Sequence, residues 1–197
     1  YHQQYDYPPE TILSHTFYEE NPEEFFRFYR SKLLCPDAQP NAAHYKLAEL
    51  EAQGKLKAVI TQNIDGLHQK EGSREVLELH GSTLRNYCEK CGKFYSLEDI
   101  LKTSGVPHCP CGGRIKPDVV LYEESLDQEV LTRSVQYIAN ADMLIIGGTS
   151  LAVYPAAGLV HYYRGHKLVV INKSSVGQDL GADLVLHEPI GEVLSQV

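Results

Sequence analysis

The sequence has no tryptophan, a single methionine and few basic residues. Its 197 residues include 26 Asp and Glu but 18 Lys and Arg, which gives a formal net charge of −8. This shortage of positive charge argues against a protein that binds nucleic acid through many phosphate contacts, so we expect no direct nucleic-acid partner. No apolar run is long enough to cross a bilayer, and the first residues show no signal-peptide pattern. We therefore expect a cytoplasmic protein without a membrane partner.

Cysteines are also few, but four of the five fall into two close pairs. Cys88 and Cys91 form one pair, and Cys109 and Cys111 form the other. Such pairs are typical of a structural zinc site, in which four thiolates leave the metal no open position. Two disulfides are the alternative, and they would need an oxidising compartment that nothing else in the sequence indicates. Cys35 stands alone and is expected to be a buried or half-buried free thiol.

Polar residues follow a short apolar stretch at 56–60. We expect this stretch to be a buried parallel strand, and ligands bind at the carboxyl ends of such strands in open α/β sheets. Gln62, Asn63 and Asp65 follow the strand and offer donors and acceptors for a carboxamide and for sugar hydroxyls. His80, a little further on, can exchange a proton near neutral pH. A strand followed by an ordinary Asx turn, with a histidine in routine hydrogen bonds, is the alternative.

Two later strands end in the same way. The strand expected at 141–146 leads into Gly147–Ser150, and the strand at 168–171 leads into Asn172. Residues 119–122 are strand-like and are expected to lead the chain back into the main domain. Because these strands alternate with helical patterns, we predict an α/β fold with a doubly wound, mostly parallel sheet.

Taken together, the motifs resemble those of the sirtuin family, of bacterial type. The matching segments are TQNIDGLH at 61–68, ELHG at 78–81, the four cysteines, GTSLAVYPA at 148–156 and Ile171-Asn172. The resemblance covers nearly the whole chain. It implies a Rossmann-like NAD-binding domain at 1–85 and 118–197 with a small zinc-ribbon-type module inserted at 86–117. Helical and loop segments within 1–55 would pack between the two.

The resemblance also implies an activity. Sirtuins are NAD-dependent protein-lysine deacylases, which convert NAD and an acylated lysine of a protein or peptide into nicotinamide, free lysine and O-acyl-ADP-ribose. His80 would be the general base, with Asn63 and Asp65 as further catalytic candidates. A module that binds NAD or ADP-ribose without turnover and a mono-ADP-ribosyltransferase are the alternatives. A binding module does not need an imidazole beside the ribose, so His80 favours an enzyme.

Other roles are implied residue by residue. The expected NAD contacts are Gln62, Asn63, Ile64, Asp65, His80, Gly148, Thr149, Ser150, Asn172, Lys173 and Ala182. The expected contacts to the substrate peptide, bound as an added strand, are Val120, Tyr122, Glu123 and Val153. One structural zinc ion is expected on Cys88, Cys91, Cys109 and Cys111.

The sequence departs from the family pattern at two places. A GAGxS phosphate-binding turn and a PDFR segment are not present, and we expect that the sequence begins downstream of those elements in a longer protein. The peptide-binding segment usually reads V-x-F-G-E, whereas here it reads Val-Leu-Tyr-Glu-Glu at 120–124. Glu123 therefore replaces a glycine and brings negative charge close to the expected peptide.

The acyl group is expected to be acetyl. In some sirtuins, a Tyr-x-x-Arg pair near the acyl tunnel favours acidic acyl groups such as succinyl. A helix is predicted to begin at Asn21, and it carries Tyr29 with Lys32 in place of that arginine. Lysine lacks the planar, two-pronged geometry that suits a carboxylate. We expect the aromatic residues of this helix, including Tyr29, to pack in the core.

Overall fold

The computed structural model describes residues 5–176 and 180–197, which fall into two compact units. The described residues of the first unit are 5–38, 63–66 and 80–126. Those of the second unit are 39–62, 67–79, 127–176 and 180–197. Residues 86–117, expected to form the zinc module, lie within the first unit. None of the helices in the described ranges has the length and apolar character needed to cross a membrane.

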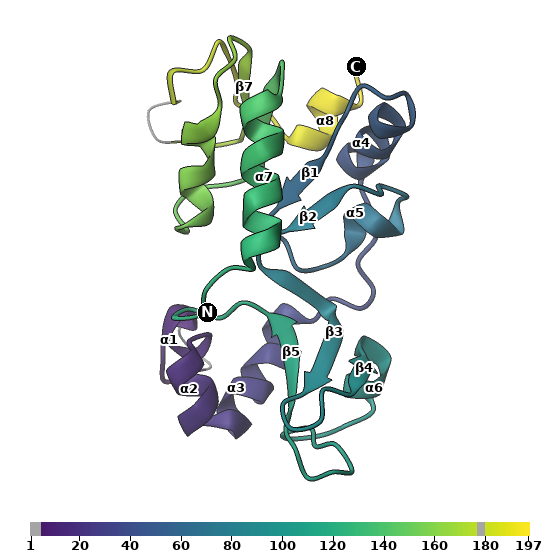
Figure 1. The fold of residues 1–197 in the computed structure, drawn as a ribbon, viewed down its shortest axis with the longest axis vertical. Coiled ribbons are helices and arrows are strands. Elements are labelled where there is room, and N and C mark those ends of the chain that lie inside the picture. Colours follow the sequence, from purple (N-terminus) through teal and green to yellow (C-terminus); the bar gives the residue numbers. More distant parts are fainter. Residues whose placement is uncertain (1–4, 177–179) are drawn as a thin grey trace. The chain divides into compact units, whose positions relative to one another are not determined.

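The second unit is built from parallel strands (Figure 1). Its strands are β1 (Val59–Thr61), β2 (Val76–Glu78), β6 (Leu144–Gly147), β7 (Leu168–Ile171) and β8 (Leu184–Leu186). β1 pairs with β2, and β6, β7 and β8 form a three-stranded sheet in that order. These parallel strands confirm the Rossmann-like α/β class predicted from the sequence. β1 begins at Val59, later than the apolar stretch at 56–60 suggested.

Helices alternate with these strands. They are α4 (Ala42–Ala52), α5 (Leu67–Lys70), α7 (Gln128–Asn140), the 3-10 helix η2 (Ala156–Tyr162) and α8 (Ile190–Leu194). α4 and α8 pack together, and Ala43, Ile171 and Leu194 form a buried apolar cluster there. α7 lies beside η2 and β2, as Figure 1 shows. Burial of the helix faces on the strands explains why β7 is almost wholly buried.

The first unit contains an antiparallel sheet with the order β4-β3-β5. β3 spans Gly81–Cys88, β4 spans Phe94–Ser96 and β5 spans Ile115–Val119, and α6 (Leu97–Leu101) follows β4. The predicted bounds of the strand at 119–122 were wrong, because β5 spans Ile115–Val119, where it pairs with β3. A short β-branched run fits either kind of sheet, and its partner strand lies far away in the sequence.

The remaining helices of the first unit surround an aromatic core. They are α1 (Pro9–Ile12), α2 (His15–Glu20), α3 (Pro22–Phe28) and the π-helix η1 (Tyr29–Leu33). Tyr18, Phe25, Phe26 and Tyr29 are each no more than 1% exposed and meet edge to face or stacked. This confirms the predicted core packing of the aromatic helix, whose α-helical part ends at Phe28 and continues as the π-helix.

Candidate active site and metal centre

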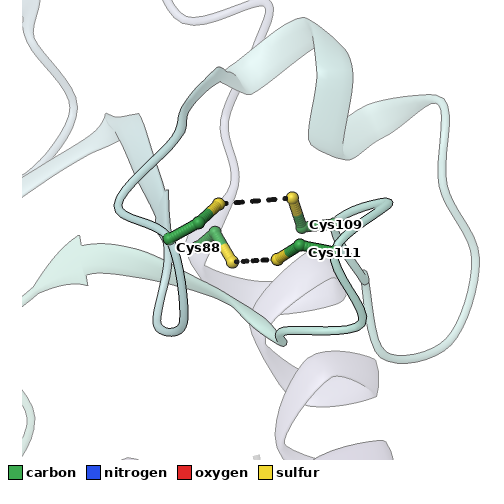
Figure 2. A group of neighbouring side chains, drawn as sticks. Cys88, Cys109 and Cys111 are labelled. Atoms are coloured by element: carbon green, nitrogen blue, oxygen red, sulfur yellow. Dashed lines mark hydrogen bonds between the residues drawn. The ribbon is translucent and has the colours of Figure 1, made fainter.

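The four paired cysteines converge on one point of the first unit. Their sulfur atoms all lie within 4.8 Å of one another. The Cys88 and Cys111 sulfurs are 3.4 Å apart, and those of Cys91 and Cys109 are 3.7 Å apart (Figure 2). A disulfide has a sulfur–sulfur distance of about 2.05 Å, so neither pair is bonded. Thiolates around a tetrahedral zinc ion lie about 3.8 Å apart, and the cluster therefore fits a four-thiolate zinc site.

Tight turns shape this cluster. The Gly92 N–H donates to the Cys88 carbonyl at 2.9 Å, and the Gly112 N–H donates to the Cys109 carbonyl at 2.8 Å. Gly113 has no room for a side chain, because a Cβ there would lie 2.5 Å from the Cys88 sulfur. The Tyr95 hydroxyl beside Cys109, helped by backbone amide donation, lowers the pKa of the Cys109 thiol to about 6. A lowered pKa favours the thiolate, which is the form that binds metal.

His80 lies directly before β3 in the first unit. The Val120 N–H donates to the His80 carbonyl at 3.0 Å, which ties the histidine to the predicted peptide-binding segment. The next residue must be glycine, because Gly81 has a φ of +75° and a Cβ there would lie 1.9 Å from the Asp118 carbonyl oxygen. Gly81 is thus required by the backbone, whereas His80 supplies an imidazole directly before the strand.

The predicted nicotinamide loop is fixed on the same strand. The backbone N–H and the hydroxyl of Thr83, in β3, both donate to the Ile64 carbonyl, at 3.0 and 3.1 Å. Gly66 closes the loop with a φ of +70°, and a Cβ there would lie 2.5 Å from Leu84 Cδ1. The structure therefore groups Asn63, Ile64, Asp65 and His80 around β3 within one unit. Their catalytic roles stay predictions.

The predicted peptide-binding segment continues from β5. The Tyr122 N–H donates to the Leu13 carbonyl at 3.0 Å, and the His15 N–H donates to the Tyr122 carbonyl at 2.9 Å, which forms a short parallel bridge. Val120 and Tyr122 thus belong to a stretch of the first unit that turns at Glu123, whereas Val153 belongs to the second unit.

The second unit has a cavity of about 520 Å³ at the carboxyl ends of β6, β7 and β8. Three of the predicted NAD contacts line it, namely Gly148, Asn172 and Lys173. Gly148 has a φ of +62°, and nothing lies within 4 Å of where its Cβ would stand, so its backbone is open to a ligand. The volume is within the usual range for small-molecule sites, and the position is where α/β sheets bind nucleotides. These features fit the adenosine part of NAD.

Two other predicted contacts, Thr149 and Ser150, directly follow Gly148 in the sequence. The Thr149 hydroxyl donates to Gln62 Oε1 at 3.3 Å, which links the ends of β6 and β1 within the second unit. Ser150 is exposed directly after Thr149. Ala182 is not among the residues that line the cavity, so its contact to adenine stays a prediction without support from this geometry.

Sequence reasoning missed part of the cavity wall. Glu188, Pro189 and Ile190 line it just after β8, and Asn41 lines it before α4. The signal for the first three was available, because the rule that singled out residues after β6 and β7 applies equally to β8. Ile190 also explains a glycine: a Cβ at Gly147 would lie 2.3 Å from Ile190 Cδ1.

Comparison with known families identifies the chain. The model of the Sir2 family matches residues 2–155. The chain belongs to the Sir2 family. A NAD-dependent protein deacetylase of Clostridium acetobutylicum is 58% identical over 195 residues, covering 98% of this chain and 80% of the relative. One of Clostridium perfringens is 59% identical over 193 residues, covering 97% of this chain and 79% of the relative.

Solved structures of Sir2 proteins have the same fold. A Sir2 bound to an acetylated peptide superposes with a TM-score of 0.87 at 40% identity, covering 94% of this chain and 81% of that one. Another Sir2, in complex with an inhibitor, 2'-O-acetyl-ADP-ribose and a deacetylated p53 peptide, has a TM-score of 0.88 at 39% identity. That comparison covers 95% of this chain and 84% of the other. Both the sirtuin resemblance and the predicted fold class are therefore confirmed.

Proposed function

We propose that this Sir2-family protein is an NAD-dependent protein-lysine deacetylase that releases nicotinamide and O-acetyl-ADP-ribose. Its substrates are NAD and acetylated lysine in a protein or peptide. The observation that carries this proposal is the arrangement around β3. The loop 63–66 is held on β3 through Thr83, and the segment 120–124 is held through Val120 to the backbone of His80, which directly precedes that strand. A chain that merely binds a nucleotide has no need of a side chain that exchanges protons near neutral pH at position 80.

Each group of residues has a part in this reaction. NAD, when bound, supplies the ADP-ribosyl group that accepts the acetyl and the nicotinamide that leaves. Asn63, Ile64 and Asp65 hold the carboxamide end, with Gln62 at a ribose hydroxyl. Gly148, Thr149, Ser150, Asn172, Lys173 and Ala182 hold the remaining sugar, phosphate and adenine groups. His80 is the general base, because imidazole exchanges protons near neutral pH.

The zinc ion has a separate role. Four thiolates fill a tetrahedral coordination shell, so the metal stabilises the β3-β4-β5 region and takes no part in the chemistry. Thiolate ligands also need a reducing environment, and we propose on this ground that the protein acts in the cytoplasm.

Mass spectrometry tests the proposed reaction directly. The full chain is incubated with NAD and an acetyl-lysine peptide, and the masses of the peptide and nucleotide products are measured. Loss of acetyl from the peptide together with O-acetyl-ADP-ribose is expected. A peptide that gains ADP-ribose would instead identify a mono-ADP-ribosyltransferase, and NAD binding with neither product would identify a binding module.

A further inference from the structure

Glu123 has a backbone conformation that ordinarily favours glycine. Its φ is +76°, in the left-handed region that side chains with a Cβ rarely adopt. A residue in that region persists where its surroundings hold it. Here the holding contacts come from the side chain itself, so the carboxylate and the strained backbone form one rigid feature.

The Glu123 carboxylate is fixed through one of its two oxygens. The backbone N–H and the hydroxyl of Thr16, at the start of α2, both donate to Glu123 Oε2, each at 2.8 Å. The Thr16 amide, and after it the hydroxyl, holds the pKa of the Glu123 carboxyl below its usual range. Within the described residues, Oε1 has no hydrogen-bond partner and Glu123 forms no ion pair with a lysine or arginine. The side chain is exposed.

The neighbouring carboxylate has a different environment. Glu124 accepts hydrogen bonds from the Leu121 N–H at 2.9 Å, from His15 Nδ1 at 2.9 Å and from Lys116 Nζ at 3.3 Å. Its charge is thus balanced inside the protein. Glu123 is therefore the acid of this pair that presents an ionised oxygen to solvent, directly after Tyr122 of the predicted peptide-binding segment.

We propose that Glu123 is a specificity-determining residue that favours substrate peptides with arginine or lysine next to the acetyl-lysine. This inference rests on the proposed function, because it takes 120–124 as the segment that binds the peptide. A carboxylate already held by Thr16 loses little freedom when a cation approaches, and its open oxygen can accept the charge-assisted hydrogen bond. The pair is exposed, so the preference is modest, about threefold in Kd, and salt weakens it.

Peptide binding without NAD measures this preference independently of turnover. Two fluorescent acetyl-lysine peptides, one with arginine and one with glutamine beside the acetyl-lysine, are titrated with the full chain and followed by anisotropy. At low salt, we expect the chain to bind the arginine peptide about threefold more tightly than the glutamine peptide. At 0.5 M salt, where the Debye screening length is about 4 Å, the two peptides should bind nearly equally. Glu123→Gln should bind both peptides equally, because the amide oxygen still accepts the Thr16 hydrogen bonds but carries no charge.

Glu20→Gln is the matched control. It removes the same charge from the exposed end of α2 and should keep the preference for the arginine peptide. A preference that survives in Glu123→Gln, or that is lost equally in Glu20→Gln, would overturn the inference. Equal binding of both peptides by the unchanged chain would overturn it as well, with the proposed function intact. Failure of both peptides to bind the unchanged chain would overturn the proposed function and the inference together.

Discussion

At the scale of single residues, Gly81 is the clearest case of sequence dictated by geometry. Two features exclude a side chain here. The backbone of Gly81 is left-handed, and a Cβ would lie 1.9 Å from a carbonyl oxygen. Gly54 has almost the same φ, +74°, but nothing within 4 Å of its Cβ position. A substitution at Gly54 therefore measures the cost of backbone strain alone, whereas one at Gly81 adds the cost of a steric clash.

We expect Gly81→Ala to destabilise the protein much more than Gly54→Ala does. The Gly54 variant should lose about 1 kcal/mol, the usual cost of a side chain in this conformation. The Gly81 variant should lose about 3 kcal/mol or more, because the backbone at Asp118 must also move. Urea unfolding of both variants measures the difference. Equal losses would mean that the β3–β5 contact relaxes easily.

His80 is expected to matter for activity and not for folding. His80→Ala should lower kcat/KM by about 10²-fold or more, the scale of a lost general base. The hydrogen bond from Val120 uses the main-chain carbonyl of His80 and survives the substitution, so the melting temperature should change little.

His108→Ala provides the comparison for this test. His108 is an exposed histidine of the same unit, whose Nδ1–H donates to the Val106 carbonyl at 2.9 Å, and its loss should leave kcat/KM unchanged. Activity that persists in His80→Ala would require another base. An unfolded His80→Ala protein would give the histidine a structural role instead.

At the scale of elements, the β3-β4-β5 region depends on its metal. Cys91→Ala removes one of four thiolates and should reduce zinc from about one ion per chain to a small fraction. Because metal binding and folding are coupled, the variant should also unfold at lower temperature. The structure exposes Cys35 instead of burying it as expected, and Cys35→Ala should therefore retain both zinc and stability. Zinc analysis by mass spectrometry with melting curves measures both, and a full zinc content in Cys91→Ala would contradict the site.

The π-helix η1 bears on the choice of acyl group. Tyr29 is 1% exposed, stacks on Phe25 with ring centroids 5.8 Å apart, and its hydroxyl has no hydrogen-bond partner among the described residues. Lys32, where an arginine would hold an acidic acyl group, is exposed. If this helix borders the acyl tunnel, a succinyl carboxylate would lose its water without gaining a two-pronged partner.

We therefore expect deacetylation to be faster than desuccinylation by about tenfold or more on the same peptide. Lys32→Arg should raise the succinyl rate and leave the acetyl rate unchanged, because the guanidinium supplies the planar donor pair. Initial rates with both peptides measure this. A wild-type preference for succinyl-lysine would refute the expectation, and no gain in Lys32→Arg would place η1 away from the tunnel.

At the scale of the whole molecule, local signals predicted the elements better than their partners. The strands before Gly148 and Asn172 were found because buried runs and polar ends are both local in sequence. The zinc cluster was found because close cysteine pairs constrain their own geometry. The strand expected at 119–122 lies at 115–119 instead, because pairing with β3, far away in the sequence, sets its bounds. The left-handed backbone at Glu123 was also beyond prediction, because its support comes from Thr16, far away in the sequence.

The stability of the whole chain should fall in acid, and the carboxylate of Glu124 contributes to this pH dependence. Burial raises the pKa of Glu124, but the Leu121 amide, His15 and Lys116 outweigh it, and the folded pKa lies below the ordinary value. A carboxyl group whose pKa is lower in the folded than in the unfolded state stabilises the fold. This stabilisation is fully present when the pH is above the unfolded-state pKa of about 4.3. That contribution is lost as the pH falls from there through the folded pKa.

Glu124→Gln tests this expectation against the unchanged chain. At pH 7 the variant should be less stable by about 1 kcal/mol, the typical net worth of such hydrogen bonds. The difference should shrink steadily below about pH 4.5, because protonation then neutralises the glutamate as the substitution does. Urea unfolding of both zinc-loaded proteins from pH 7 to pH 3 measures the gap, and any acid loss of zinc affects the two alike. A gap that stays constant over this range would mean that the Glu124 charge contributes nothing to stability and that its hydrogen bonds serve equally well when it is neutral.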